Sequence, residues 1–211
     1  MSDDQRALLV EVSHLLAARN FTTATGGNIS LRLPDGGCWV TPSRLHKARV
    51  QLADLVRVDA DGCVVTGTRL PSSETFMHLA AYRALPRAGA IIHAHPPAAT
   101  GFAQARKPIE TTSSSEAFAI LGPEVPLLPF AHPGTQELAD QIGAAMQPSR
   151  RAYLLAHHGV LTWGENLWDA YDTLDTLELY TQTLLAAAIA GGAIPLPEED
   201  LAILAKKYHQ Q

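Results

Sequence analysis

Short strand-like segments and longer helix-like segments alternate along this chain of 211 residues, and several of the links between them have only hairpin length. Apolar and alternating runs predict strands over residues 29–33, 38–41, 55–58, 63–66, 90–95, 152–156 and 160–163. Helical periodicity predicts helices over residues 5–19, 71–85, 98–105, 115–121, 135–146, 166–190 and 197–208. Such a mixed order indicates a central, largely antiparallel sheet flanked by helices.

Composition narrows the class of protein. Hydrophobic residues make up 46% of the sequence, which suits one compact domain over residues 1–211. The net charge of -5 and the lack of a basic run argue against nucleic acid as a partner. The most apolar stretch, residues 184–194, is too short to cross a bilayer, and the acidic start does not resemble a signal peptide. We therefore expect a soluble cytoplasmic protein with no membrane partner.

Two histidine motifs predict a metal site. His93 and His95 are two residues apart at the end of an apolar strand, so both imidazoles point to the same face of the sheet and can reach one ion. His157-His158-Gly159 interrupts two further strand-like runs, and adjacent residues face opposite ways, so only one of these histidines is expected to bind. Three histidines and one exchangeable position would form an open, catalytic zinc site.

Glu74 follows Pro71-Ser72-Ser73 at the expected first turn of a helix. One interpretation is structural, with Ser72 as the N-cap and Glu74 favoured by the helix dipole. The other is catalytic, with Glu74 moving a proton near the metal. His78 lies four residues further on and shares the helix face of Glu74. It is either a second metal-binding group there or, as we prefer, a helix histidine with its hydrogen bonds satisfied.

Three short segments have features that favour phosphate binding. Gly26-Gly27-Asn28 offers backbone N–H groups with little steric obstruction, Thr41-Pro42-Ser43-Arg44 adds a hydroxyl and a guanidinium, and Ser72-Ser73 places hydroxyls beside a helix N-terminus. Each segment is weak evidence alone, since Gly-Gly-Asn is often only a turn. Together they would satisfy the oxygens of a phosphate group.

In this order, five motifs resemble the class II aldolase and adducin head-domain family, over nearly the whole chain. They are Thr25-Gly26-Gly27-Asn28-Ile29-Ser30, Val40-Thr41-Pro42-Ser43, Pro71-Ser72-Ser73-Glu74, His93-Ala94-His95-Pro96 and His157-His158-Gly159. The resemblance implies a three-layer α/β/α fold with a nine-stranded, mainly antiparallel sheet. It also implies a homotetramer with active sites at the subunit interfaces.

The resemblance assigns roles to the matched residues. His93, His95 and His158 would bind Zn2+, although another divalent metal such as cobalt or manganese could replace it. Glu74 would act as the acid/base and could also bind the metal. The phosphate would be held by Gly27, Asn28, Ser43, Ser72 and Ser73, with Arg44 as a further candidate from its own side chain.

The implied reaction is metal-dependent cleavage of a ketose 1-phosphate to dihydroxyacetone phosphate and a small aldehyde. Suitable substrates are of the fuculose, deoxyribulose or methylthioribulose 1-phosphate type. Fuculose-type aldolases carry a catalytic tyrosine after the His-x-His strand, but here residues 111–116 contain none. Tyr208 matches an aromatic position near the C-terminus. Proton delivery to the aldehyde half is therefore expected to differ.

Other reactions of the same family stay open. Lys47, Glu116 before Ala119-Ile120-Leu121, and Thr162-Trp163-Gly164 resemble methylthioribulose-1-phosphate dehydratase, in which Glu116 would be the acid/base; a surface carboxylate near a helix start is the alternative. A 4-epimerase or a decarboxylase would use the same metal site. A non-catalytic module of the adducin type is disfavoured, because it has no need for three histidines and Glu74.

Overall fold

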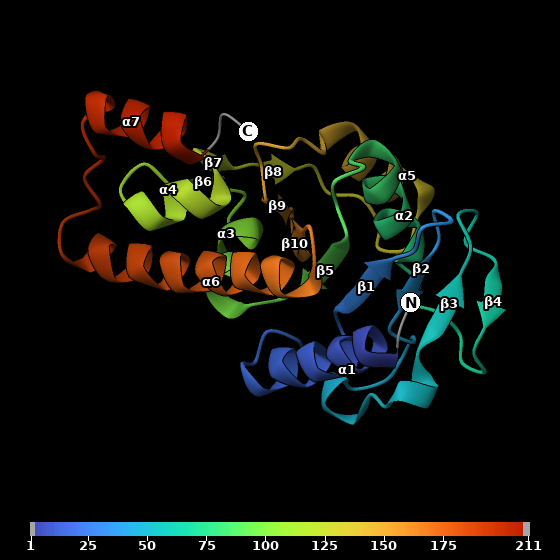
Figure 1. Cartoon of the computed structure of the whole chain (residues 1–211). Coiled ribbons are helices and arrows are strands. Elements are labelled where there is room, and N and C mark those ends of the chain that lie inside the picture. Colours follow the sequence, from blue (N-terminus) through green and yellow to red (C-terminus); the bar gives the residue numbers. More distant parts are fainter. Residues whose placement is uncertain (1–2, 209–211) are drawn as a thin grey trace.

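The computed structural model describes residues 3–208 (Figure 1), which form helices on both sides of a central sheet. The strands are β1 Asn28–Arg32, β2 Cys38–Val40, β3 Val56–Val58, β4 Val64–Thr66, β5 Ala90–Ala94, β6 Ile109–Glu110, β7 Glu124–Val125, β8 Leu127–Leu128, β9 Ala152–Leu155 and β10 Gly159–Gly164. The α-helices are α1 Asp3–Ala18, α2 Thr75–Ala84, α3 Pro97–Gln104, α4 Ser115–Leu121, α5 Gln136–Ala145, α6 Leu167–Ile189 and α7 Glu198–Tyr208. All the predicted segments are present, with shifts of a few residues at their ends.

The main sheet has the strand order β4-β3-β2-β1-β5-β10-β9-β8. Its neighbours are antiparallel except β8 and β9, which run parallel. This confirms the predicted mainly antiparallel sheet.

The nine-strand sheet implied by the resemblance is not found within residues 3–208, where eight strands form the main sheet and β6 and β7 form a separate pair. Pro126 stands between β7 and β8, and its carbonyl accepts a hydrogen bond from the N–H of Leu154. Before Pro126, β7 pairs with β6, and after it, β8 pairs with β9. The strands β6, β7 and β8 have two residues each, too few to show a period in the sequence.

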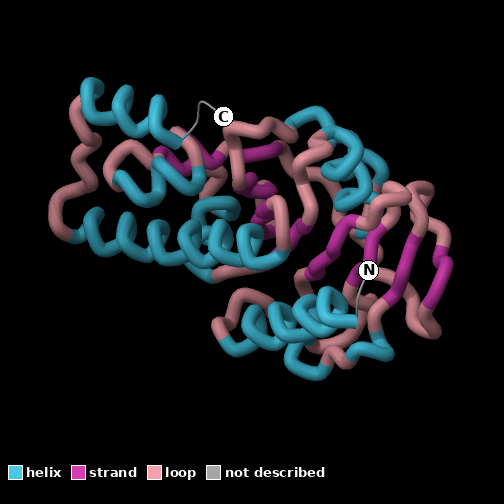
Figure 2. Tube along the Cα trace, in the orientation of Figure 1, coloured by secondary structure: helices cyan, strands magenta, loops and turns pink. Residues whose placement is uncertain are grey.

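Two apolar cores separate three layers, as Figure 2 shows by the strands running between helical groups. One core joins the sheet to α1, α3, α4 and α6, and the other joins it to α2 and α5. Strand β5 contributes to both, because Ala90, Ile92 and Ala94 face the first core and Ile91 faces the second. The expected α/β/α layering is therefore confirmed.

The central position of β5 places the candidate site. Its neighbours are β1, where Asn28 lies opposite His93, and β10, where Leu161 lies opposite His93. Directly after β5, Pro97 begins α3, because proline suits the first turn of a helix. Within residues 3–208, no helix has both the length and the apolar character that crossing a membrane requires.

Candidate active site

Three of the predicted histidines converge beside the end of β5. His93 lies on β5, His95 follows it by two residues, and His158 lies in the turn between β9 and β10. The ring centroids of His93 are 4.7 Å from His95 and 4.5 Å from His158, and those of His95 and His158 are 5.4 Å apart. One potential ligand atom from each ring lies within 4.8 Å of the other two. These three residues therefore form a group that could hold a metal ion.

The histidines are held in the neutral form that metal ligation requires. Nδ1 of His93 is 2.8 Å from the carbonyl oxygen of Val160, so it donates its proton there and leaves Nε2 as the ligand atom. Burial, followed by the nearby His158, lowers the pKa of His93 to about 3. Burial, followed by His93 and His158, lowers the pKa of His95 to about 3. Burial also lowers the pKa of His158, against an opposite effect of Glu74.

Four buried polar atoms around this point have no hydrogen-bond partner among residues 3–208. They are Nε2 of His93, Nδ1 of His95, Nδ1 of His158 and Oε1 of Glu74. Buried atoms of this kind are costly unless something satisfies them. Each neutral imidazole offers one nitrogen lone pair and the carboxylate offers its oxygens, so three histidines and Glu74 are a set of residues that fits a divalent cation.

Glu74 faces the histidines and does not cap its helix. It occupies the N-cap position of α2 with φ -99° and ψ 13°, but its side chain makes no capping hydrogen bond. Its Oε2 lies 3.3 Å from Nε2 of His93, and its Oε1 lies 3.5 Å from Nε2 of His158. The prediction of Ser72 as the N-cap residue is therefore wrong, because α2 begins at Thr75 and its N-cap is Glu74. The hydroxyl of Ser72 instead accepts a hydrogen bond from the N–H of Glu74 at 3.3 Å.

His78 is a satisfied helix histidine, as preferred, and lies outside the three-histidine group. It is fully buried, with Nδ1 2.7 Å from Oγ of Ser30 and Nε2 2.5 Å from Oδ1 of Asn28. The amide nitrogen of Asn28 in turn donates to Oε2 of Glu74 at 2.8 Å. His78 therefore reaches the site through Asn28.

One cavity of about 320 Å³ brings the predicted phosphate-binding residues to the histidines. Its lining includes Glu74, His95 and His158 together with all six of those residues, namely Gly27, Asn28, Ser43, Arg44, Ser72 and Ser73. Gly27 has φ +70°, and a Cβ there would lie under 3.0 Å from the carbonyl oxygen of His93 and from Thr22. The position therefore requires glycine, both for its backbone angle and for its closeness to β5.

Lys47 lies buried beside the glycine loop, which the sequence pattern did not reveal. Its Nζ donates to the carbonyl oxygens of Thr25 at 3.3 Å and of Leu45 at 3.2 Å. Burial lowers its pKa to about 8. Lys47 therefore holds the backbone of Thr25, a residue that lines the cavity, and places a positive charge behind the cavity wall.

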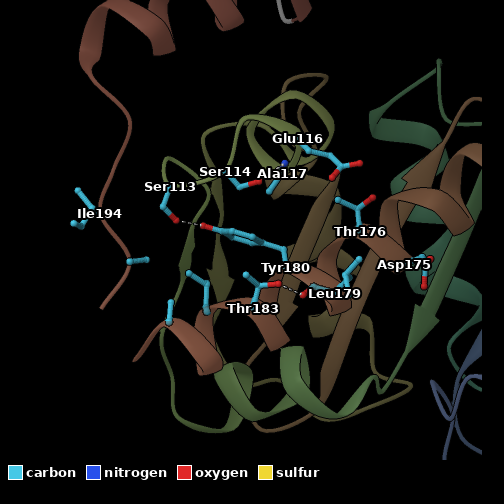
Figure 3. Close-up of a pocket in the computed structure, with 13 residues that line it drawn as sticks. Ser113, Ser114, Glu116, Ala117, Asp175, Thr176, Leu179, Tyr180, Thr183 and Ile194 are labelled. Atoms are coloured by element: carbon cyan, nitrogen blue, oxygen red, sulfur yellow. Dashed lines mark hydrogen bonds between the residues drawn. The ribbon is translucent and has the colours of Figure 1, made fainter. Parts of the chain in front are cut away.

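Glu116 and Tyr208 lie away from the histidines within one chain. Glu116 lines a hollow of about 390 Å³ between α4 and α6, where the hydroxyl of Ser113 is 2.8 Å from that of Tyr180 (Figure 3). Tyr208 lines another hollow, with Arg87 and Arg151. Neither hollow shares a residue with the cavity at the histidines.

His157 is separated from its neighbour by the turn. It has φ +57°, is exposed, and its ring centroid lies 6.3 Å from that of Phe130. It is not part of the three-histidine group. The left-handed backbone at His157 lets the chain reverse and aims His158 alone toward β5.

Ser30 and Tyr82 belong to the same buried network and were not singled out from the sequence. Oγ of Ser30 is 2.7 Å from the hydroxyl of Tyr82. A signal for them existed in the spacing, because Asn28 and Ser30 share a strand face and His78 and Tyr82 share a helix face.

Comparison with known proteins identifies the class that the fold and site define. Residues 7–185 match the Class II Aldolase and Adducin N-terminal domain, so the chain belongs to this family. It is 34% identical over 205 residues to a 5-deoxy-D-ribulose 1-phosphate aldolase of Bacillus thuringiensis, covering 97% of this chain and 95% of the relative. It is 32% identical over 180 residues to a 3-oxo-tetronate 4-phosphate decarboxylase of Escherichia coli, covering 82% of each.

A solved structure of L-fuculose 1-phosphate aldolase is similar over 99% of this chain and 97% of its own, with a TM-score of 0.90 and 35% identity. The family membership and the aldolases among the relatives confirm the predicted lyase of the class II aldolase type.

Proposed function

We propose that this protein is a zinc-dependent aldolase that cleaves a ketose 1-phosphate to dihydroxyacetone phosphate and a small aldehyde. The observation that carries this proposal is the single cavity lined by two histidines of the three-histidine group, by Glu74 and by the phosphate-binding candidates. A phosphate group and a divalent cation bound there would hold a short substrate at two points. Such fixation sets which carbon–carbon bond faces the acid/base.

Hydroxyl and backbone donors in the cavity suit a phosphate dianion. Ser43, Ser72 and Ser73 contribute hydroxyl groups, and the loop at Gly27 lets a ligand approach backbone N–H groups closely. Asn28 keeps one amide hydrogen for a ligand after its bond to Glu74. The guanidinium of Arg44 adds positive charge at the edge of this cavity, and the ammonium of Lys47 adds positive charge behind it.

His93, His95 and His158 would hold Zn2+, with Glu74 able to take a fourth position. Zinc is favoured because three neutral imidazoles suit it and leave a position open. When bound, zinc supplies Lewis-acid chemistry, which stabilises negative charge developing on substrate oxygen atoms.

Glu74 would exchange a proton with the carbon skeleton of the substrate. Its carboxylate lies between the histidine group and the phosphate-binding candidates, so it faces the reacting carbons of a substrate held at both ends. Its burial excludes bulk water, which would otherwise compete for that proton.

A deoxypentulose 1-phosphate is the substrate we favour. The relative named as a 5-deoxy-D-ribulose 1-phosphate aldolase matches along almost the whole chain. The absence of a tyrosine from residues 111–116 agrees with an aldehyde half that carries few hydroxyl groups. The resemblance of Glu116 and Lys47 to the dehydratase supports methylthioribulose 1-phosphate as a second candidate substrate, either for cleavage or for dehydration.

A decarboxylase is the second candidate function, because one relative is named as a decarboxylase of a phosphorylated keto acid. A 4-epimerase would also use this site but would rebind the aldehyde before release. An adducin-like module is disfavoured by the converging histidines.

The phosphorylated substrate is charged and crosses membranes poorly, which supports action in the cytoplasm.

We also propose a homotetramer in which neighbouring subunits complete each site. The support is that Glu116 and Tyr208 lie outside the cavity of their own chain. A contact between subunits would bring these side chains to the histidines of the neighbour, where either could serve the aldehyde half.

A product screen tests the function. The zinc-loaded protein is incubated with 1-phosphorylated ketoses and with a phosphorylated 3-keto acid, and dihydroxyacetone phosphate, dehydrated diketone and CO2 are measured separately. Dihydroxyacetone phosphate supports the aldolase, diketone assigns the dehydratase, and CO2 assigns the decarboxylase. Glu74→Gln should lower the rate by about 100-fold or more while zinc content stays unchanged.

A further inference from the structure

Five buried side chains form a continuous hydrogen-bonded row that ends on Glu74. The row runs Tyr82, Ser30, His78, Asn28, Glu74, with successive distances of 2.7, 2.7, 2.5 and 2.8 Å. It connects one strand, β1, with one face of α2. None of its first four members lies in the three-histidine group.

The charge on Glu74 sets the direction of every bond in this row. A carboxylate only accepts hydrogen bonds, so Asn28 must present its NH2 to Oε2 and its carbonyl oxygen to His78. His78 then donates from Nε2, and because burial keeps this ring neutral, its Nδ1 accepts. Ser30 therefore donates to His78, and Tyr82 donates to Ser30.

The two oxygens of Glu74 consequently differ. Oε2 accepts the bond from Asn28 and lies 3.3 Å from Nε2 of His93, whereas Oε1 finds no hydrogen-bond partner within residues 3–208 and lies 3.5 Å from Nε2 of His158.

We propose that this row fixes the orientation of the Glu74 carboxylate in the cavity, and that His78 is the positioning residue on which this orientation depends, because it holds the Asn28 amide that donates to Oε2. This proposal rests on the proposed function. Bonds aligned in one direction strengthen each other, so the row would hold the carboxylate firmly.

The test compares His78→Leu with His78→Gln. Leucine removes both bonds of the ring, whereas glutamine can still donate to Asn28 and accept from Ser30. We expect kcat to fall about 10- to 100-fold in His78→Leu, as for other groups that orient a functional side chain, with KM changed less than about two-fold. His78→Gln should recover most of kcat. Equal kcat values in wild type and His78→Leu would overturn the proposal.

Ser30→Ala has a matched control in Ser13→Ala. Both hydroxyls are fully buried, but that of Ser13 donates to the carbonyl oxygen of Leu9 in α1, outside the row. The two variants should have equal thermal stability. Ser30→Ala should lower kcat, whereas Ser13→Ala should leave kcat unchanged. An equal loss of kcat in the two variants would show a general packing effect and reject the row.

Crystal structures separate this proposal from the proposed function. If the wild type cleaves no ketose phosphate, the aldolase assignment fails, and the row is judged by geometry alone. A displaced Asn28 amide and Glu74 carboxylate in His78→Leu, restored in His78→Gln, would support it. Unchanged positions in His78→Leu would reject it whatever the reaction.

Discussion

Glu178 is a buried carboxylate that ties the long helix α6 to the segment carrying His95. Its two oxygens accept hydrogen bonds from the backbone N–H groups of Ala98, at 3.0 and 3.1 Å, and of Ala99, at 3.0 Å. Pro96, the N-cap residue of α3, has no side-chain capping bond. Glu178 therefore serves as the cap from a distant part of the chain, where its charge also complements the helix dipole.

Glu178→Ala should lower the free energy of unfolding by about 2 to 3 kcal/mol, because two buried N–H groups lose a charged acceptor. Urea denaturation measures the change. Glu165→Ala is the control, since Glu165 is about half exposed and pairs with the exposed Arg87, so its loss should cost less than about 1 kcal/mol. Equal effects of the two substitutions would contradict the capping role.

The pKa of His78 predicts an acid-sensitive stability. Burial, followed by the charge of His93, lowers this pKa from 6.5 to about 3 against the opposite effect of Glu74. Below pH 6.5, His78 therefore binds a proton in the unfolded chain, whereas in the folded chain it stays neutral until the pH falls toward 3. The stability associated with a neutral His78 is complete above pH 6.5 and is lost as the pH falls toward 3.

Unfolding free energies of the metal-free protein measured from pH 7 to pH 4 test this. His78→Gln keeps the hydrogen-bonding groups but cannot titrate, so its stability should fall less steeply than that of the wild type. Identical slopes would mean that His78 contributes nothing to the acid sensitivity.

At the scale of elements, the turn that joins β9 to β10 packs directly against the end of β5. A Cβ built on Gly159 would lie under 3.0 Å from Cδ2 of His95 and from the carbonyl oxygen of Ala94. Because residue 159 has no side chain, the start of β10 can lie close to the end of β5, and this brings His158 and His95 together. This is a close approach that only glycine allows.

Gly159→Ala should push the ring of His95 out of place and weaken zinc binding by about 10- to 100-fold, as measured by competition with a chelator. Gly101→Ala is the control, because a Cβ at residue 101 in α3 meets no atom within 4 Å. It should leave the zinc affinity unchanged and stabilise the helix by about 0.5 to 1 kcal/mol. Unaltered zinc affinity in Gly159→Ala would contradict the steric account.

At the scale of the whole molecule, the residues assigned to chemistry occupy separate hollows. Glu74 and two of the histidines line one. Glu116 lines a second beside Tyr180 (Figure 3), and Tyr208 lines a third. A single chain cannot combine Glu74 and Glu116 in one site with this arrangement. The proposed tetramer would combine them across an interface.

Mixed oligomers test this arrangement. Glu74→Gln and Glu116→Gln proteins, each impaired alone, are unfolded and refolded together in equal amounts. If each site takes Glu74 from one subunit and Glu116 from another, roughly a quarter of the sites regain both native residues, and activity rises accordingly. Light scattering checks that all samples have the same oligomeric state. A mixture no more active than its parents would place both residues in one subunit or exclude Glu116 from the reaction.

Much of the fold and part of the candidate site could be predicted from local sequence. The periods of two and 3.6 residues predicted the principal strands and helices, because those periods follow from backbone geometry alone. The same geometry predicted that the side chains of His93 and His95 point to the same face of the sheet. The strands β6, β7 and β8 escaped prediction, because two residues cannot display a period.

The sequence by itself determined which residue types were available, namely imidazoles, a carboxylate, hydroxyls and a glycine loop. The family resemblance had named His158 and Glu74, but only the tertiary structure brings His158 and not His157 to β5, turns Glu74 inward, and joins His78 to Glu74 through Asn28. The physical reason is that these contacts join residues from separate elements, 46 residues apart for Asn28 and Glu74 and 50 for Asn28 and His78, and depend on the order of strands in the sheet. Local propensities carry no information about that order.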